Sequence, residues 1–388
     1  MKQSKKMYLV VAGAGILTLG LTGSALAFHG GGVAHCDGCH SMHNSASNAA
    51  NDAGSDFLMK GSDPSSTCLN CHEGSGGYHI ASSDGSNVNQ GGDFYWMKTS
   101  YQYDTGHSTP WSTESRHGHN VVASDFGFTA DANNTEAPGG TFPASTLGCD
   151  SCHDPHGQVD GGTEAGTEPI SVSGSYGENA TEGTIAGNFR LLGDSSYITT
   201  LQSYSFNADA PVAVSANDWG SSYGYETDYG DGMSAWCGNC HGDYLGGTGT
   251  EKHPSGTMLN STYRDRYNSY VASGDYTGSV EDGYDSLVPI ERGTEDKSSL
   301  NATSTTGAES GAQVMCGTCH RAHGSAFDYA GRWDFGTELL VESSTDLEMN
   351  GDLTGDEADY YAFGSKVEIA DRYNEEQRSL CNKCHVQD

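Results

Sequence analysis

Six copies of the pattern Cys-x-x-Cys-His run through this 388-residue chain and contain all twelve of its cysteines. Two cysteines three positions apart, followed directly by histidine, place both thiols and the imidazole on one side of a single helical turn. Such a turn can bond the two vinyl groups of one haem while its histidine reaches the iron, and this spacing is the c-type haem attachment signature. The predicted thioether cysteines are Cys36, Cys39, Cys68, Cys71, Cys149, Cys152, Cys237, Cys240, Cys316, Cys319, Cys381 and Cys384, and the predicted proximal iron ligands are His40, His72, His153, His241, His320 and His385. The chain is therefore expected to hold six covalently bound c-type haems.

A single copy of this motif is equally typical of half a zinc site or of a disulfide. A zinc ribbon pairs its Cys-x-x-Cys units and does not need a histidine at the same place each time. Here no cysteine is left over and no motif lacks its histidine. The repetition favours haem over both alternatives.

The remaining histidines bear on whether the irons transfer electrons or bind a substrate. An iron with two histidine ligands has no open coordination position, so it passes electrons only. Sixteen histidines minus six proximal ones leaves ten, more than enough for a second ligand on every iron. Three candidates, His43, His156 and His323, lie three residues after a motif histidine; the other candidates are His79, His119, His253 and His29, and His35, His107 and His117 look like spares. Seven candidates thus compete for six places.

The first 27 residues are predicted to form a signal peptide. Three lysines precede an apolar stretch over about residues 8–21, and Ala25-Leu26-Ala27 forms a small-x-small cleavage site. The apolar stretch is too short for a membrane anchor, and no second one follows. We expect residues 28–388 to form a single hexahaem domain without an integral membrane span. This domain would pass through the periplasm and be secreted to the outer cell surface or the medium, where thioether attachment protects the cysteines from oxidation.

Composition indicates how such a chain would fold. Only 35% of the residues are hydrophobic and 54 are glycine, a balance that leans toward disorder without a cofactor. The porphyrins must then supply much of the apolar core. We expect a multihaem cytochrome c fold, mostly loop with short helices and little regular strand, wrapped around a continuous row of six stacked haems. The motif spacing indicates no regular structural repeat, and the first two haems are expected to form a close pair. We expect Gly/Ser/Asp-rich surface loops over 157–187 and 220–232. A helix is expected over about 366–380.

The chain is strongly acidic, with 18 basic and 51 acidic residues and a formal net charge of -33. Loss of the three signal-peptide lysines leaves 15 against 51, a net of -36. Nucleic acid and anionic lipid headgroups are therefore poor partners for this chain, and no nucleic-acid partner is expected. Acidic surroundings and histidine in place of methionine as axial ligand both favour ferric iron, which predicts low reduction potentials.

Several longer stretches resemble the OmcS-like family of extracellular hexahaem c-type cytochromes, the cytochrome nanowires of metal-reducing bacteria. They begin with Phe28-His29-Gly-Gly-Gly-Val33 and include Cys-His-Ser-Met-His43-Asn44, Tyr78-His79-Ile80, Gly118-His119-Asn120, Ala137-Pro138-Gly139-Gly140-Thr141, Cys152-His153-Asp154-Pro155-His156-Gly157 and Cys319-His320-Arg321-Ala322-His323. The resemblance spans essentially all of residues 28–388. It implies an electron carrier, not an enzyme, that polymerises into a conductive filament of stacked bis-histidine haems and delivers electrons to extracellular acceptors such as metal oxides or partner cells.

In that family a histidine near the N-terminus binds a haem of the adjacent subunit, and the matching residue is His43. Its expected target is the fifth haem, attached through Cys316 and Cys319 and ligated by His320. The alternative is that His43 ligates a haem of its own chain, and His35 could compete for a nearby iron.

Two other functions remain open from the sequence. The first is a monomeric periplasmic or surface electron shuttle. The second is a multihaem reductase of a small nitrogen or sulfur oxyanion, which would need a free or lysine-ligated iron position. The chain contains no Cys-x-x-Cys-Lys motif, and no catalytic residues are predicted.

Overall fold

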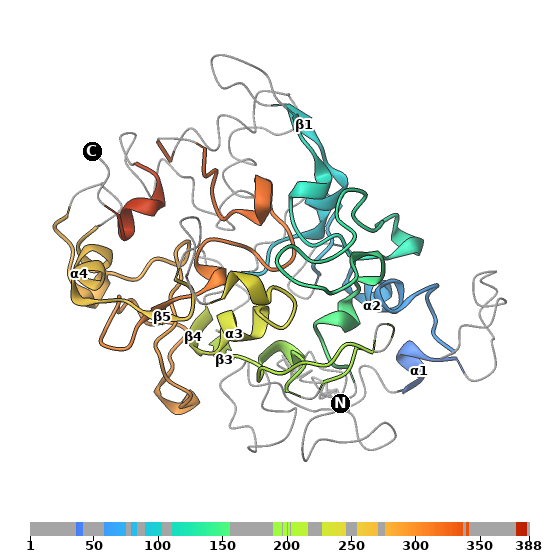
Figure 1. The fold of residues 1–388 in the computed structure, drawn as a ribbon, viewed down its shortest axis with the longest axis horizontal. Coiled ribbons are helices and arrows are strands. Elements are labelled where there is room, and N and C mark those ends of the chain that lie inside the picture. Colours follow the sequence, from blue (N-terminus) through green and yellow to red (C-terminus); the bar gives the residue numbers. More distant parts are fainter. Residues whose placement is uncertain are drawn as a thin grey trace, which may run out of the picture.

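Short helical turns joined by loops make up most of the molecule (Figure 1). The computed structural model describes residues 36–41, 58–74, 79–83, 90–102, 111–155, 189–195, 197–199, 201, 203–215, 227–245, 254–270, 276–336, 339–340 and 378–385. Over these residues the prediction of a mostly loop chain with short helices and little strand is confirmed. The helix expected over 366–380 falls largely outside them, and only its last three residues are described. Arg378 forms an isolated bridge with Leu339, and Leu380 begins a 3-10 turn, so no α-helix is present over these three residues.

All six Cys-x-x-Cys-His motifs begin on a helical turn. Three lie on α-helices and three on 3-10 helices: α1 (Cys36–Cys39), α2 (Pro64–His72), η6 (Cys149–Ser151), α3 (Met233–Cys237), η13 (Cys316–Thr318) and η15 (Leu380–Lys383). The remaining α-helix, α4, covers Ser261–Ser269. Capping side chains determine where two of these helices begin. The Asp63 carboxylate accepts the Ser66 N–H at 2.7 Å before the proline that opens α2, and Asn260 caps α4 in the same way.

Strands occur only as short antiparallel pairs among the described residues. The pairs are β1 (Tyr101–Gln102) with β2 (Trp111–Ser112), β3 (Val212–Ser215) with β4 (Thr227–Asp231), and β5 (Thr257–Met258) with β6 (Gln313–Val314). Glu291 bridges Tyr229 of β4 and Gln313 of β6, which joins the last two pairs into one small sheet. The sequence prediction of a surface loop over 220–232 is therefore wrong for its second half, because β4 is buried along most of its length.

In the part of the chain that the structure describes, three separate apolar clusters stand in place of a single core. The first packs Trp96, Tyr267 and Trp333 around the cysteines of the fifth and sixth motifs. The second gathers apolar side chains next to α2, and the third surrounds Met315 beside the fifth motif. Each cluster adjoins one or two motifs, as expected for a chain whose apolar content is too small to bury a core by itself.

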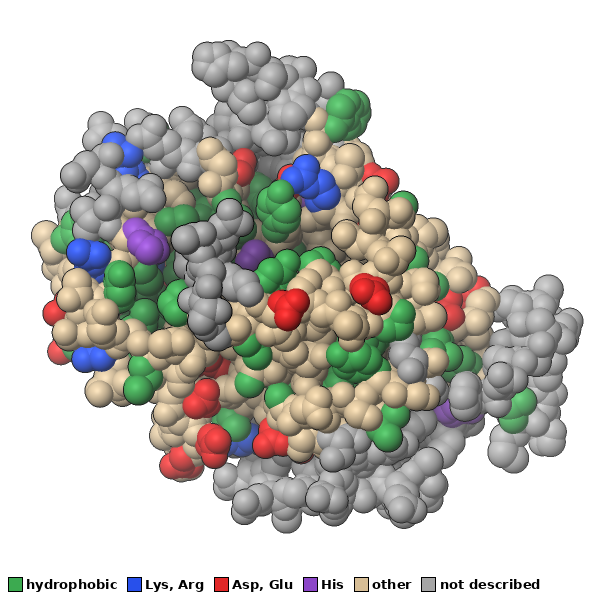
Figure 2. Space-filling model, in the orientation of Figure 1, with side chains coloured by type: hydrophobic (Ala, Val, Ile, Leu, Met, Phe, Trp, Pro, Cys, Tyr) green, Lys and Arg blue, Asp and Glu red, His purple; other side chains and the backbone are tan. Residues whose placement is uncertain are grey.

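The labelled helices are spread along the long axis of the molecule (Figure 1). The turn of α1 lies at one end, α3 lies near the middle, and α4 and the C-terminal turn lie at the other end. On the face drawn in Figure 2, acidic side chains gather along the lower edge, and a histidine lies at the bottom of a hollow.

Candidate functional site

Four of the motifs close a helical turn through their own backbone. The N–H of the motif histidine donates to the carbonyl of the first motif cysteine. These bonds join His153 to Cys149 at 2.9 Å, His241 to Cys237 at 3.0 Å, His320 to Cys316 at 3.1 Å and His385 to Cys381 at 2.9 Å. The turn brings the two thiols and the imidazole of one motif together, which is the arrangement that thioether haem attachment requires.

Successive motifs also contact one another through their cysteines. The Cys68 thiol lies next to that of Cys149, and the Cys237 thiol lies next to that of Cys316. Cysteines of the other consecutive motifs are close enough to interact electrostatically. In chain order, the neighbouring cysteine pairs are Cys39 with Cys68, Cys68 with Cys149, Cys152 with Cys240, Cys237 with Cys316 and Cys319 with Cys381. The first two motifs are close, as predicted, and so is every other consecutive pair. Groups attached here would form one continuous row.

Two proximal histidines each face a distal candidate. The ring centroids of His153 and His323 lie 6.3 Å apart, and those of His241 and His119 lie 6.0 Å apart. A metal–imidazole bond of about 2.0 Å on each side of one iron places two axial rings about 6 Å apart. The donor set therefore fits haem iron at the third and fourth motifs.

Carbonyl acceptors orient these imidazoles. His153 Nδ1 lies 2.8 Å from the Arg190 carbonyl, His241 Nδ1 lies 2.7 Å from that of Pro138, and His119 Nδ1 lies 2.6 Å from that of Ala322. His320 Nδ1 similarly lies 2.8 Å from the Tyr329 carbonyl. A carbonyl can only accept, so Nδ1 carries the proton and Nε2 keeps its lone pair for a metal.

Burial also lowers the pKa of three of the candidate ligands, His119, His153 and His323. Loss of solvent, reinforced by the neighbouring His153, lowers the pKa of His323 to about 3. Desolvation likewise lowers the pKa of His119 and of His153. Neutral imidazole is the form that ligates a metal, so electrostatics and geometry agree at these positions.

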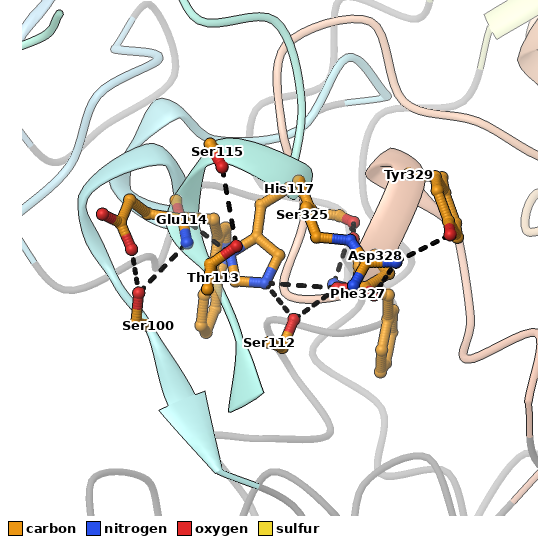
Figure 3. Close-up of polar contacts among 12 residues, drawn as sticks. Ser100, Ser112, Thr113, Glu114, Ser115, His117, Ser325, Phe327, Asp328 and Tyr329 are labelled. Atoms are coloured by element: carbon orange, nitrogen blue, oxygen red, sulfur yellow. Dashed lines mark hydrogen bonds and ion pairs between the residues drawn. The ribbon is translucent and has the colours of Figure 1, made fainter. Parts of the chain in front are cut away.

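His117 has a different role, as Figure 3 shows. Its side chain is fully buried, with Nε2 2.6 Å from the Ser112 hydroxyl and Nδ1 3.0 Å from the Trp96 carbonyl. The Ser112 hydroxyl also donates to Asp328 at 2.5 Å. Both ring nitrogens of His117 already have protein partners, which accounts for its place among the spare histidines.

The other candidates are only partly described. The His79 ring has a buried Nδ1 with no hydrogen-bond partner among the described residues, and the adjacent Ile80 N–H donates to the His72 carbonyl at 2.9 Å. The His79 segment therefore lies beside the second motif. His29, His43, His156 and His253 lie outside the described residues, as do His35 and His107.

Sequence reasoning missed the carbonyl acceptors. Gly140 gives one signal, since a Cβ there would lie 1.8 Å from the Cys240 carbonyl oxygen, so the turn that presents Pro138 requires glycine at this position. Arg190 and Tyr329 carry no such signal, because any residue supplies a carbonyl.

No helix among the described residues is long and apolar enough to cross a membrane.

Comparison with known proteins gave close relatives but no matching family model. The C-type cytochrome OmcS of Geobacter sulfurreducens is 37% identical over an alignment that covers all of both chains. Two solved structures are also similar: an outer membrane cytochrome S filament at 35% identity, and OmcS nanowires imaged by cryo-electron microscopy at 36%, both from Geobacter sulfurreducens. Each superimposes with a TM-score of 0.76 and covers 93% of this chain and 100% of the other.

Proposed function

Because this chain belongs to the family of OmcS-like c-type cytochromes, we propose that it is a hexahaem, bis-histidine cytochrome that assembles into filaments and carries electrons to extracellular acceptors. It is an electron carrier and not an enzyme. Covalently bound haem supplies the redox chemistry, and the chain supplies thioether cysteines, axial imidazoles and the order of the row. The proposed electron acceptors are metal oxides and partner cells.

One observation carries the proposal: histidines from distant parts of the chain pair at the separation that one iron requires. In the third motif His153 faces His323, and in the fourth His241 faces His119. Each pair draws its two members from different motifs or intervals, so ligation would link segments far apart in sequence. An iron between two such rings has no open position, which favours electron transfer over reduction of an oxyanion.

The row of motifs supports conduction through the whole subunit. Cysteines of consecutive motifs are in contact or in electrostatic reach from the first motif to the sixth. Haems attached along this row would lie close to one another. No tyrosine or tryptophan relay is then needed, and the aromatic side chains act as packing around the motifs.

The filament requires a contact between subunits, and we assign it to His43. In this proposal the imidazole of one subunit completes the iron of the fifth motif in its neighbour, beside His320. Residues 1–27 serve as the export signal, and residues 28–388 form the single mature domain that reaches the outer surface through the periplasm.

Two measurements on the purified protein test the proposal. A pyridine haemochrome assay with protein quantification should give six haems per chain, and electron paramagnetic resonance of the ferric filament should show low-spin haem only. A stoichiometric high-spin signal would instead support an enzyme with an open iron.

Filament assembly is tested separately. The His43→Ala variant should yield discrete subunits with one high-spin haem, whereas the matched control His107→Ala should form normal filaments. Filaments of unchanged length and spin state in His43→Ala would refute the contact between subunits.

A further inference from the structure

The fifth motif is clamped by a short segment that we name the strap, residues 329–332. The Arg321 N–H, directly after the motif histidine, donates to the Ala330 carbonyl at 2.7 Å. In return the Arg332 N–H donates to the Cys319 carbonyl at 2.8 Å. The strap therefore pairs with the motif on both sides of His320, like a very short antiparallel ladder.

The same clamp recurs at the first and third motifs. In the third motif, Asp154 N–H donates to the Leu191 carbonyl at 2.8 Å and Gly193 N–H to the Cys152 carbonyl at 2.9 Å. In the first motif, Ser41 N–H donates to the Leu58 carbonyl at 2.7 Å and Lys60 N–H to the Cys39 carbonyl at 2.9 Å. The donors and acceptors occupy equivalent positions in all three, although motif spacing predicted no repeat.

All three straps adopt an unusual backbone conformation at the same place. Ala330, Leu191 and Leu58 have φ angles of 53°, 57° and 52°, and the preceding Tyr329 and Arg190 have φ angles of 62° and 52°. None of the five is glycine, asparagine or aspartate, the residues that adopt left-handed backbone most readily. Backbone of this kind persists only where the surroundings hold it in place, and it clusters at functional sites.

The left-handed turn aims a carbonyl at the proximal imidazole. The Tyr329 carbonyl lies 2.8 Å from His320 Nδ1, and the Arg190 carbonyl lies 2.8 Å from His153 Nδ1. In the fourth motif, His241 Nδ1 instead donates to the carbonyl of Pro138, which precedes two glycines in a turn. The strapped motifs are also the three in which a second histidine follows three residues after the first: His43, His156 and His323.

We propose that the left-handed strap residues Tyr329 and Arg190 are positioning residues, which fix the plane of the proximal imidazole and raise its basicity toward the iron. This inference rests on the proposed function, since it concerns haem at these motifs. A carbonyl that accepts the Nδ1 proton makes Nε2 a stronger donor to iron and so favours the ferric state. The geometry assigns this role at the third and fifth motifs, where left-handed backbone holds the acceptor carbonyl.

Tyr329 offers the sharper test because its side chain is 62% exposed, so its replacement disturbs little packing. Tyr329→Val places a β-branched residue at a left-handed position, whereas Tyr329→Asn and Tyr329→Gly tolerate that conformation. All three lose the same side-chain contact, the 2.7 Å hydrogen bond from Arg116. They therefore differ mainly in whether the strap can keep its shape.

The measurements are a spectroelectrochemical titration and ferric electron paramagnetic resonance on filaments with a verified haem count. In Tyr329→Val one midpoint potential of six should rise and one low-spin g value should move, while Tyr329→Asn and Tyr329→Gly should match the wild type. Equal behaviour of all three variants would overturn the proposal. If Tyr329→Val does not accumulate, the same comparison can be made at the third motif with Arg190→Val and Arg190→Asn.

The outcome is separable from that of the proposed function. A high-spin haem in the wild type would refute bis-histidine ligation, and a count below six would refute the hexahaem assignment. The strap is judged only by the difference between valine and asparagine variants.

Discussion

Replacing Glu291 by glutamine should remove a loss of stability that the wild type undergoes as the pH rises. The Glu291 side chain is 1% exposed. One of its oxygens accepts the Met233 N–H at 2.6 Å, and the other has no hydrogen-bond partner among the described residues. Burial, with a smaller contribution from nearby Asp231, raises the pKa of this carboxyl from its ordinary 4.5 to about 8.

The sign and size of the effect follow from linkage. The folded state holds the proton more tightly than the unfolded state, so the protein loses stability as pH rises from about 4.5 to about 8. At about 1.4 kcal/mol per pKa unit, full ionisation costs roughly 5 kcal/mol. Glutamine is neutral at every pH and keeps the acceptor for the Met233 N–H. At pH 5 the two proteins should be alike, and above pH 8 the variant should be more stable by a Tm difference on the order of 10 °C.

Thermal unfolding followed by circular dichroism from pH 5 to pH 9 measures this difference. Glu281→Gln is the matched control, because Glu281 is fully exposed and its removal should leave the pH profile unchanged. Parallel Tm profiles for Glu291→Gln and the wild type would show that Glu291 ionises normally in the folded protein, and would refute the reasoning.

Three further predictions concern the motifs and their supports. His119→Ala should convert one haem of six to a high-spin state, since the ring opposite His241 is lost, and an unchanged resonance spectrum would rule out this pairing. Gly140→Ala should lower the yield of fully loaded protein several-fold, because its Cβ would lie 1.8 Å from the Cys240 carbonyl oxygen, and normal yield by haem staining would contradict this. Arg292→Met should destabilise the fold by about 3 kcal/mol in denaturant unfolding, because it leaves the Asp228 carboxylate buried without its 2.7 Å partner; a change under about 1 kcal/mol would count against that ion pair.

The sequence predicted the local part of the site well. A Cys-x-x-Cys-His motif spans one helical turn, so its geometry depends on neighbouring residues only, and the turns at Cys149 and Cys316 follow it. The loop-rich fold was also predictable, since low apolar content excludes an ordinary core.

Long-range pairing could not be predicted in the same way. The ring that faces His241 is that of His119, and nothing in the sequence around either residue specifies the other. The buried strand β4 was missed because the sequence Thr227-Asp-Tyr-Gly-Asp231 has little strand propensity, and burial against neighbouring segments holds it in place. The straps were missed for a related reason, because tertiary contacts impose a left-handed backbone on Tyr329 and Arg190 that their residue types do not favour.

The central claim is a row of bis-histidine haems in motif order, and cryo-electron microscopy of the assembled protein tests it most directly. We expect a filament in which the third iron lies between His153 and His323, the fourth lies between His241 and His119, and the row continues across each subunit contact. Discrete particles, or a third or fourth iron ligated by other residues, would contradict it.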